Sequence, residues 1–101
     1  MTRLCLIIPV YNEAGNLAPL AAELARAVNT QAGLERILWV DNGSSDGSSQ
    51  ELEALSARYP WSRVLRLPEN RGYGGGLRAG VSETRGFTHI GWIPADGQIS
   101  V

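Results

Sequence analysis

Residues 37–47 read Ile-Leu-Trp-Val-Asp-Asn-Gly-Ser-Ser-Asp-Gly, so that an apolar run leads directly into a loop of acidic, amide, hydroxyl and glycine residues. A continuous apolar run is typical of a strand that is buried on both faces of a parallel sheet. The loop has more side-chain oxygens than a plain turn requires, and Asp41 is its best candidate for binding a base or a ribose. The structural alternative is an Asx turn that leads into a capped helix.

Polar or glycine residues follow a predicted strand at four places along the chain, in residues 6–13, 37–47, 70–76 and 92–98. In an open α/β sheet the carboxyl ends of the strands line one crevice, so residues far apart in the sequence converge there on a ligand. The four segments therefore indicate a nucleotide-binding edge.

Helices are predicted between the strands. Residues 16–33 contain an apolar stripe at helical spacing, and Asn16 is the expected N-cap. Ser48, with Glu51 three residues later, predicts a capping box at the start of a second helix. A short third helix is expected after a glycine-rich loop at residues 70–76. Strands that alternate with helices predict a mainly parallel sheet with helices on both faces, an α/β fold.

Length and composition restrict the class of protein. The 101 residues fit one domain, and the apolar fraction of 44% and charged fraction of 19% are ordinary for a globular protein. The net charge of -1 argues against nucleic-acid binding. The lone Cys5 excludes an intrachain disulfide and fits a reducing compartment. No stretch approaches the roughly 18 apolar residues needed to span a membrane.

The exit of the first strand carries an aromatic ring, an amide and a carboxylate. Tyr11 can lie against a base, and Glu13 can accept hydrogen bonds from ligand hydroxyls. On residue types alone, helix capping by Asn12 and Glu13 is an equal alternative.

The glycine-rich segment comes close to the dinucleotide-binding fingerprint but has Leu77 in place of the third glycine, and it follows the third strand. A dinucleotide dehydrogenase is therefore disfavoured, because its fingerprint belongs after the first strand. Backbone N–H groups of residues 74–76, with Arg71 and Arg78, could still hold a diphosphate. The alternative is a tight turn.

Asp96 and Gln98 are two residues apart, so on a continuing strand they project from the same face. Two oxygens there form a partial site for Mg²⁺ or Mn²⁺, which diphosphate oxygens and water would complete. The alternative is an ordinary Asp-Gly turn.

Taken together, the motifs resemble the family 2 glycosyltransferases, in particular the group that transfers sugars to dolichyl and other polyprenyl phosphates. The matching segments, in order, are residues 8–13, 40–47, 70–72 and 95–98. The resemblance implies a Rossmann-like, nucleotide-diphospho-sugar transferase fold. It also implies nucleotide-binding roles for Pro9, Tyr11, Glu13, Asp41, Arg71 and Asp96, and metal-binding roles for Asp96 and Gln98.

Two positions depart from the family pattern. Pro94 stands where the family's metal motif has its first Asp, whereas Asp96 keeps the second. Asn42 replaces a frequent second Asp in the paired-acid segment, which exchanges a pure acceptor for an amide that both donates and accepts.

The resemblance implies an inverting transferase that moves a sugar from a nucleotide-diphospho-sugar to an acceptor such as a polyprenyl phosphate, with a divalent cation, Mg²⁺ or Mn²⁺, as cofactor. The family's general base comes from beyond the metal motif, so no catalytic residue is expected within this chain. We expect residues 1–101 to be the amino-terminal, nucleotide-sugar-binding part of a domain that is truncated at the carboxyl end. The expected location is cytoplasmic, at the cytoplasmic face of a membrane in the full-length protein.

Two alternatives belong to other functional classes. A non-catalytic or truncated nucleotide-binding module would have the same nucleotide-binding edge but would lack the general base of a transferase. A nucleotidyltransferase is disfavoured because it requires a glycine-rich loop with a basic residue right after the first strand, which residues 9–15 lack.

Overall fold

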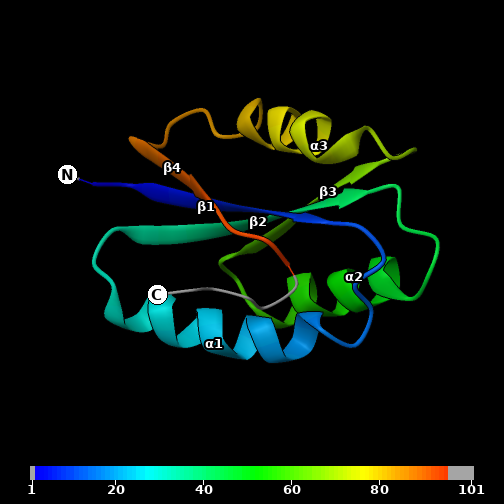
Figure 1. Ribbon diagram of the computed structural model, residues 1–101. Coiled ribbons are helices and arrows are strands. Elements are labelled where there is room, and N and C mark those ends of the chain that lie inside the picture. Colours follow the sequence, from blue (N-terminus) through cyan, green and yellow to red (C-terminus); the bar gives the residue numbers. More distant parts are fainter. Residues whose placement is uncertain (1, 96–101) are drawn as a thin grey trace.

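A single parallel sheet organises the chain in a computed structural model that describes residues 2–95 (Figure 1). The described elements, in chain order, are β1 (Leu4–Val10), α1 (Leu17–Thr30), β2 (Leu34–Asn42), α2 (Ser48–Arg58), β3 (Ser62–Leu67), α3 (Gly72–Val81) and β4 (His89–Trp92). The strands lie in the order β3-β2-β1-β4, and each neighbouring pair is parallel. The predicted α/β fold with a parallel sheet and flanking helices is confirmed.

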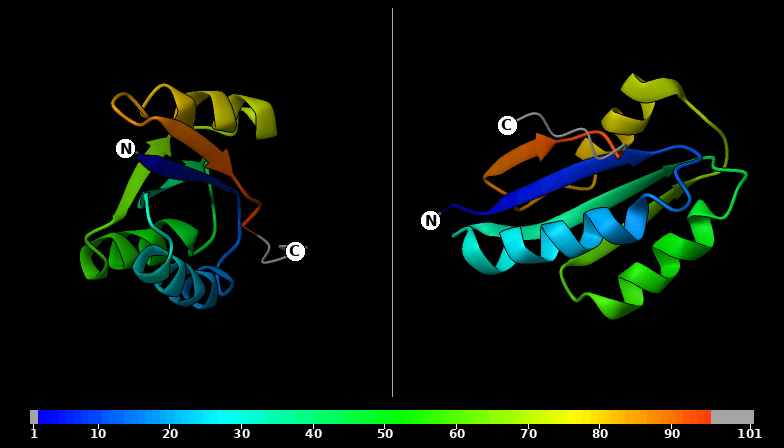
Figure 2. Two further views of the ribbon diagram at one scale, coloured as in Figure 1. Left: turned by 90° about the vertical axis from the view of Figure 1, so that its left-hand side faces the viewer. Right: turned by 60° about the horizontal axis from the view of Figure 1, so that its bottom comes forward.

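The helices cover both faces of the sheet unequally. Helices α1 and α2 lie side by side on one face, whereas α3 lies on the other (Figures 1 and 2). The chain runs outward from β1 to β3 and then returns across the opposite face to place β4 on the far side of β1. The strand order therefore reverses between β1 and β4, and ligands of open α/β sheets bind at such a switch point.

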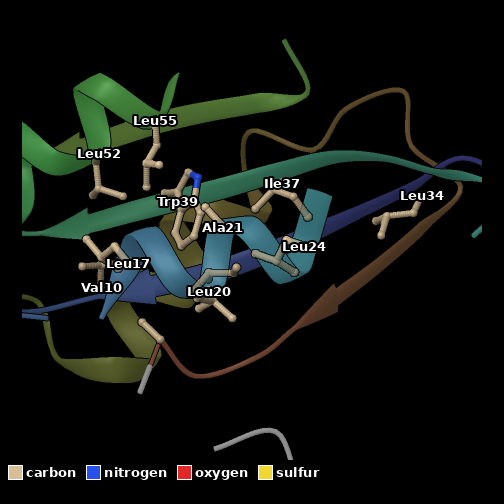
Figure 3. Close-up of a cluster of buried hydrophobic side chains, with 12 residues drawn as sticks. Val10, Leu17, Leu20, Ala21, Leu24, Leu34, Ile37, Trp39, Leu52 and Leu55 are labelled. Atoms are coloured by element: carbon tan, nitrogen blue, oxygen red, sulfur yellow. The ribbon is translucent and has the colours of Figure 1, made fainter. Parts of the chain in front are cut away.

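The larger core lies between the sheet and helices α1 and α2 (Figure 3). The apolar stripe predicted for the first helix is confirmed, because Leu17, Leu20, Ala21 and Leu24 are buried in it. Trp39 of β2 is fully buried there, and its Nε1 donates a hydrogen bond to Ser62 Oγ at 2.8 Å. This bond satisfies the one polar atom of the ring inside an apolar environment.

Helix α3 corrects the expected glycine-rich loop, because Gly72 to Gly76 form its first turns. Glycine disfavours a helix interior by about 1 kcal/mol relative to alanine. Close packing offsets that cost: a Cβ at Gly80 would lie 2.8 Å from Ile7 Cγ2 and 2.9 Å from Val40 Cγ2. Gly80 therefore lets α3 approach β1 and β2 more closely than a residue with a Cβ would allow.

Cys5 lies in the smaller core beneath α3, with 1% of its surface exposed. Burial raises the pKa of its thiol, as expected for a structural cysteine. Among residues 2–95, no helix has the length and apolar character needed to cross a membrane.

Candidate functional site

A cavity of about 280 Å³ opens at the switch point of the sheet. Its walls come from four places in the sequence: the end of β1 with the loop after it, the end of β2, the start of α3 with the loop before it, and the segment after β4. The described lining residues are Pro9, Val10, Tyr11, Glu13, Asn42, Asn70, Gly72, Tyr73, Pro94 and Ala95. The convergence of distant segments predicted from the sequence is therefore present in the structure.

Three of the predicted nucleotide-binding residues, Pro9, Tyr11 and Glu13, line this cavity. Tyr11 is 48% exposed, so its ring surface is accessible to a ligand. Arg71 is exposed and forms the N-cap of α3, between two lining residues of the same loop. Asp96 and Gln98 lie outside the described residues.

Asp41 lies apart from these residues and lines a second cavity of about 260 Å³. Its side chain is buried, and Oδ1 accepts a hydrogen bond from the N–H of Ser44 at 3.1 Å. Its Oδ2 accepts from Ser49 Oγ on α2 and lies 3.7 Å from Arg66 Nε. Because successive strand residues point to opposite faces, Asp41 faces α2 while Asn42 faces α3.

Asn42 ties the end of β2 to the start of α3. Its Nδ2 donates to the carbonyl oxygen of Gly72 at 2.8 Å, and its Oδ1 accepts from the N–H of Arg71 at 2.9 Å. The side chain is 4% exposed. Asn42 lines the cavity, although the sequence reasoning assigned it no ligand role. The departure of Asn42 from the family pattern was the one signal that could have identified it.

The loop after β1 is held by the loop after β2. Asn12 adopts a left-handed backbone with φ of 53°, a conformation that asparagine tolerates better than most residues. Its N–H donates to Ser44 Oγ at 3.1 Å, and its Oδ1 accepts from the N–H of Ser45 at 2.8 Å. The N–H of Glu13 donates to Ser48 Oγ at 2.8 Å. These bonds set the position of Tyr11 and Glu13 at the cavity.

Both expected helix caps differ from the sequence prediction. Asn16 makes no side-chain cap, and its Nδ2 instead donates to Glu13 Oε2 at 3.0 Å. Glu51 does not close a capping box with Ser48. Its carboxylate accepts hydrogen bonds from N–H groups at the start of α1, those of Gly15, Leu17 and Ala18, each at 3.1 Å.

Asp46, which precedes the N-cap Gly47 of α2, binds both the start of that helix and the neighbouring loop. Its Oδ1 accepts from the N–H of Ser48 at 2.8 Å, and its Oδ2 accepts from the N–H of Ala14 at 3.2 Å. Hydrogen bonding to Ser48, and more weakly to Ala14, lowers the pKa of this carboxyl. The charged form of Asp46 is therefore part of the loop assembly.

The described part of the cavity wall has one carboxylate, that of Glu13. Across residues 2–95, no group of three His, Cys, Asp or Glu side chains is placed to hold a metal ion. The predicted metal residues Asp96 and Gln98 follow Ala95, which itself lines the cavity.

Comparison with known proteins identifies the family. The model of glycosyl transferase family 2 matches residues 5–101. An undecaprenyl-phosphate 4-deoxy-4-formamido-L-arabinose transferase from Edwardsiella ictaluri is 37% identical over 82 residues, which are 79% of this chain and 25% of that protein. A dolichyl-phosphate beta-glucosyltransferase from Saccharomyces cerevisiae is 30% identical over 100 residues, which are 93% of this chain and 30% of that protein.

Solved structures share the fold. TarS of S. aureus superposes with a TM-score of 0.76 at 20% identity, over 94% of this chain and 17% of that one. The mannosyltransferase PcManGT of Pyrobaculum calidifontis, solved with GDP-Man and Mn²⁺, gives 0.70 at 22% identity, over 93% of this chain and 27% of that one.

The chain spans between a quarter and a third of the length of these curated relatives. Its parallel sheet, its cavity at the switch point and the family match over residues 5–101 agree with one another. The chain belongs to glycosyl transferase family 2.

Proposed function

We propose that residues 1–101 form the nucleotide-sugar-binding part of an inverting glycosyltransferase. The observation that carries the proposal is the cavity at the switch point between β1 and β4, with Tyr11 and Tyr73 in its wall. Aromatic rings beside a few polar groups are what a nucleoside requires of a binding site.

The donor's nucleoside diphosphate would occupy this cavity. Tyr11 would lie against the base, while Pro9 and Glu13 complete that wall of the site. Arg71 and the N–H groups at the start of α3 would bind the diphosphate, because a helix N-terminus favours anions. Asp41 would contact the base or ribose from the neighbouring cavity, where Ser44 and Ser49 already orient its carboxylate.

Asp96 and Gln98 would hold Mg²⁺ or Mn²⁺ together with oxygens of the donor. Such an ion stabilises the negative charge that develops on the leaving diphosphate. A neighbour of the same fold, PcManGT, was solved in complex with GDP-Man and Mn²⁺. The general base would come from beyond this motif.

A polyprenyl phosphate is the proposed acceptor. The support is sequence similarity to relatives whose names include undecaprenyl-phosphate and dolichyl-phosphate. A lipid-linked acceptor would place the enzyme at the cytoplasmic face of a membrane.

A non-catalytic nucleotide-binding module is the second candidate. Pro94, which replaces the first acid of the family's metal motif, lies in the cavity wall and cannot contact a metal ion through a carboxylate. The two candidates differ in metal dependence, because a donor site needs the ion to bind the diphosphate fully and a simple module does not.

An NMR titration of the 101-residue chain with UDP and GDP, each with and without Mg²⁺, tests the proposal. We expect amide shifts at Tyr11, Gly72 and Tyr73 that grow with Mg²⁺, while the amide of Asn29, exposed on α1, stays unchanged. Asp96→Asn should abolish the increase of these shift changes with Mg²⁺ but should not alter the shift changes that the nucleotides cause without metal. Metal-independent shifts would favour the non-catalytic module, and a folded chain that responds to neither nucleotide would refute both candidates.

A further inference from the structure

Asn42 connects two elements that are far apart in the sequence at the wall of the cavity. Within one buried side chain, an N–H donor meets the carbonyl oxygen of Gly72 and an oxygen acceptor meets the N–H of Arg71. The two partners are consecutive residues at the turn into α3. This pairing therefore fixes the rotation of that turn relative to the end of β2.

The pairing requires a neutral amide. A carboxylate of the same shape could accept from the N–H of Arg71, but its second oxygen would face the carbonyl oxygen of Gly72, and two acceptors without a proton repel each other. Helix α3 packs closely on this side chain and leaves little room for a longer one, because a Cβ at Gly76 would lie 2.8 Å from Asn42 Nδ2. Among these alternatives, asparagine alone satisfies both partners in the available space.

The turn that Asn42 holds carries one wall of the cavity. Asn70, Gly72 and Tyr73 line the cavity from this segment, and Asn42 itself lines it from β2. Tyr73 is 54% exposed at the wall. Because little packing holds its ring, the position of the ring depends on the backbone that carries it. Among residues 2–95, no other side chain of β2 forms a hydrogen bond with this turn.

We propose that Asn42 is a positioning residue for the donor nucleotide, one that sets nucleotide affinity by holding the Arg71–Gly72 turn and with it the Tyr73 wall. The inference rests on the proposed nucleotide site. It explains why the chain has an amide where the family frequently has an acid: here the side chain at position 42 binds the neighbouring loop with both of its polar atoms.

Substitution by aspartate provides a test that depends on pH. In Asn42→Asp the carboxylate would be buried and would face the carbonyl oxygen of Gly72, and both effects raise its pKa above the ordinary value of about 3.9. Once protonated, the acid can donate to Gly72 and accept from Arg71, as the amide does. Affinity lost near neutral pH should therefore return as the pH is lowered.

The titratable and charged groups around position 42 are Tyr11 and Glu13 on the loop after β1, Asp41 on β2, and Arg71 and Tyr73 at the start of α3. All of them are present in the wild-type chain and in each variant at position 42. The ratio of variant Kd to wild-type Kd at each pH therefore corrects for the pH dependence that the two chains share, including that of the nucleotide.

The experiment measures Kd for UDP and GDP with Mg²⁺ by NMR titration of folded chains between about pH 4.5 and 7.5. Asn42→Ala should weaken binding about tenfold at every pH, as for the loss of one or two hydrogen bonds. Asn42→Asp should weaken nucleotide binding by at least as much at about pH 7.5, and its Kd should approach the wild-type Kd at about pH 4.5. Asn29→Asp, which adds the same charge on exposed α1, should match wild type throughout.

A double-mutant cycle separates positioning from a general loss of structure. If Asn42 acts through the Tyr73 wall, Asn42→Ala should weaken binding much less in a Tyr73→Ala background than in the wild-type chain. Because the cycle needs only alanine variants, it keeps the test decisive even if Asn42→Asp fails to fold.

Three results would overturn the inference: wild-type affinity in Asn42→Ala, no recovery of Asn42→Asp at low pH, or full additivity with Tyr73→Ala. If the wild-type chain binds neither nucleotide, the proposed function fails and the inference fails with it. If the wild-type chain binds and the variants at position 42 bind equally well, the inference alone fails.

Discussion

Glu51 of α2 accepts a hydrogen bond from the backbone N–H of Leu17, the first residue of α1, at 3.1 Å. The same carboxylate also accepts from Gly15 and Ala18. A negative charge at the start of a helix is favourable, and here it comes from a neighbouring helix. The two helices that cover one face of the sheet are therefore joined at the end nearest the cavity.

Replacing Glu51 tests the strength of this junction. Glu51→Ala leaves three N–H groups without a charged acceptor, and we expect it to lower the free energy of unfolding by about 1–3 kcal/mol. Urea denaturation measures the change. Glu53→Ala is the matched control on the same helix, because Glu53 is 67% exposed and pairs with the half-exposed Arg66; its loss should stay within about 0.5 kcal/mol. Equal losses of unfolding free energy in the two variants would show that the hydrogen bonds of Glu51 to the start of α1 add no stability.

Asp46 makes stability depend on pH at the acid end. Its hydrogen bonds to Ser48 and Ala14 lower its pKa below the ordinary 3.8 in the folded chain. The unfolded chain therefore takes up the proton first as pH falls, so this contribution is complete above 3.8 and is lost as pH drops through the lower folded value. In Asp46→Asn, the free energy of unfolding measured by urea titration should fall less steeply as the pH is lowered through the acid range. An unchanged slope below about pH 4 would argue against a stabilising role of the charged Asp46 carboxylate.

The packing of α3 distinguishes two glycines of one helix. Gly80→Ala should destabilise the chain by about 1–3 kcal/mol, because its Cβ would clash with Ile7 and Val40. Gly74→Ala is the control: the nearest atom to its Cβ is a flexible guanidinium nitrogen of Arg78 at 4.0 Å. That substitution should stabilise by about 0.5–1 kcal/mol through helix propensity. Thermal unfolding of both variants gives the comparison, and a stabilised Gly80→Ala would contradict the close approach.

The role of Asp41 is tested by an isosteric change. In Asp41→Asn the amide can still accept from the N–H of Ser44 and can donate to Ser49 Oγ, so we expect the chain to remain folded. If Asp41 reads the base or ribose, affinity should fall about tenfold for the free nucleoside as well as for the diphosphate. Calorimetry with uridine, guanosine, UDP and GDP makes the measurement. A change confined to the diphosphates would remove Asp41 from base recognition.

Strand and helix identity could be predicted because each depends on nearest neighbours in the sequence. The apolar run before Asp41 predicted β2, and the stripe from Leu17 to Leu24 predicted the buried face of α1. Helix–strand alternation then restricted the topology, since crossovers between parallel strands are right-handed. The same reasoning placed Pro9, Tyr11 and Glu13 at one edge, where the cavity lies.

The partners of polar side chains could not be predicted in the same way. Ser48 and Glu51 have the spacing of a local capping box, yet both bind the loop after β1. A hydroxyl or carboxylate accepts from any N–H that comes within about 3 Å, so spacing in the sequence does not select among donors brought close by packing. The local rule therefore placed the start of α2 within one residue, since Gly47 and not Ser48 is the N-cap, and it was wrong about what the first turn binds.

The sequence by itself determined the order of strands and helices, the family, and the edge of the sheet at which the polar segments meet, because apolar periodicity and motif order are properties of the chain alone. Only the tertiary structure decided that Asp41 and Asn42 serve different cavities, that four glycines of the expected loop form a helix, and that Asn42 holds the Arg71–Gly72 turn. The physical reason is that each of these depends on which backbone groups and side chains close packing brings within contact distance, across some 30 residues of intervening sequence.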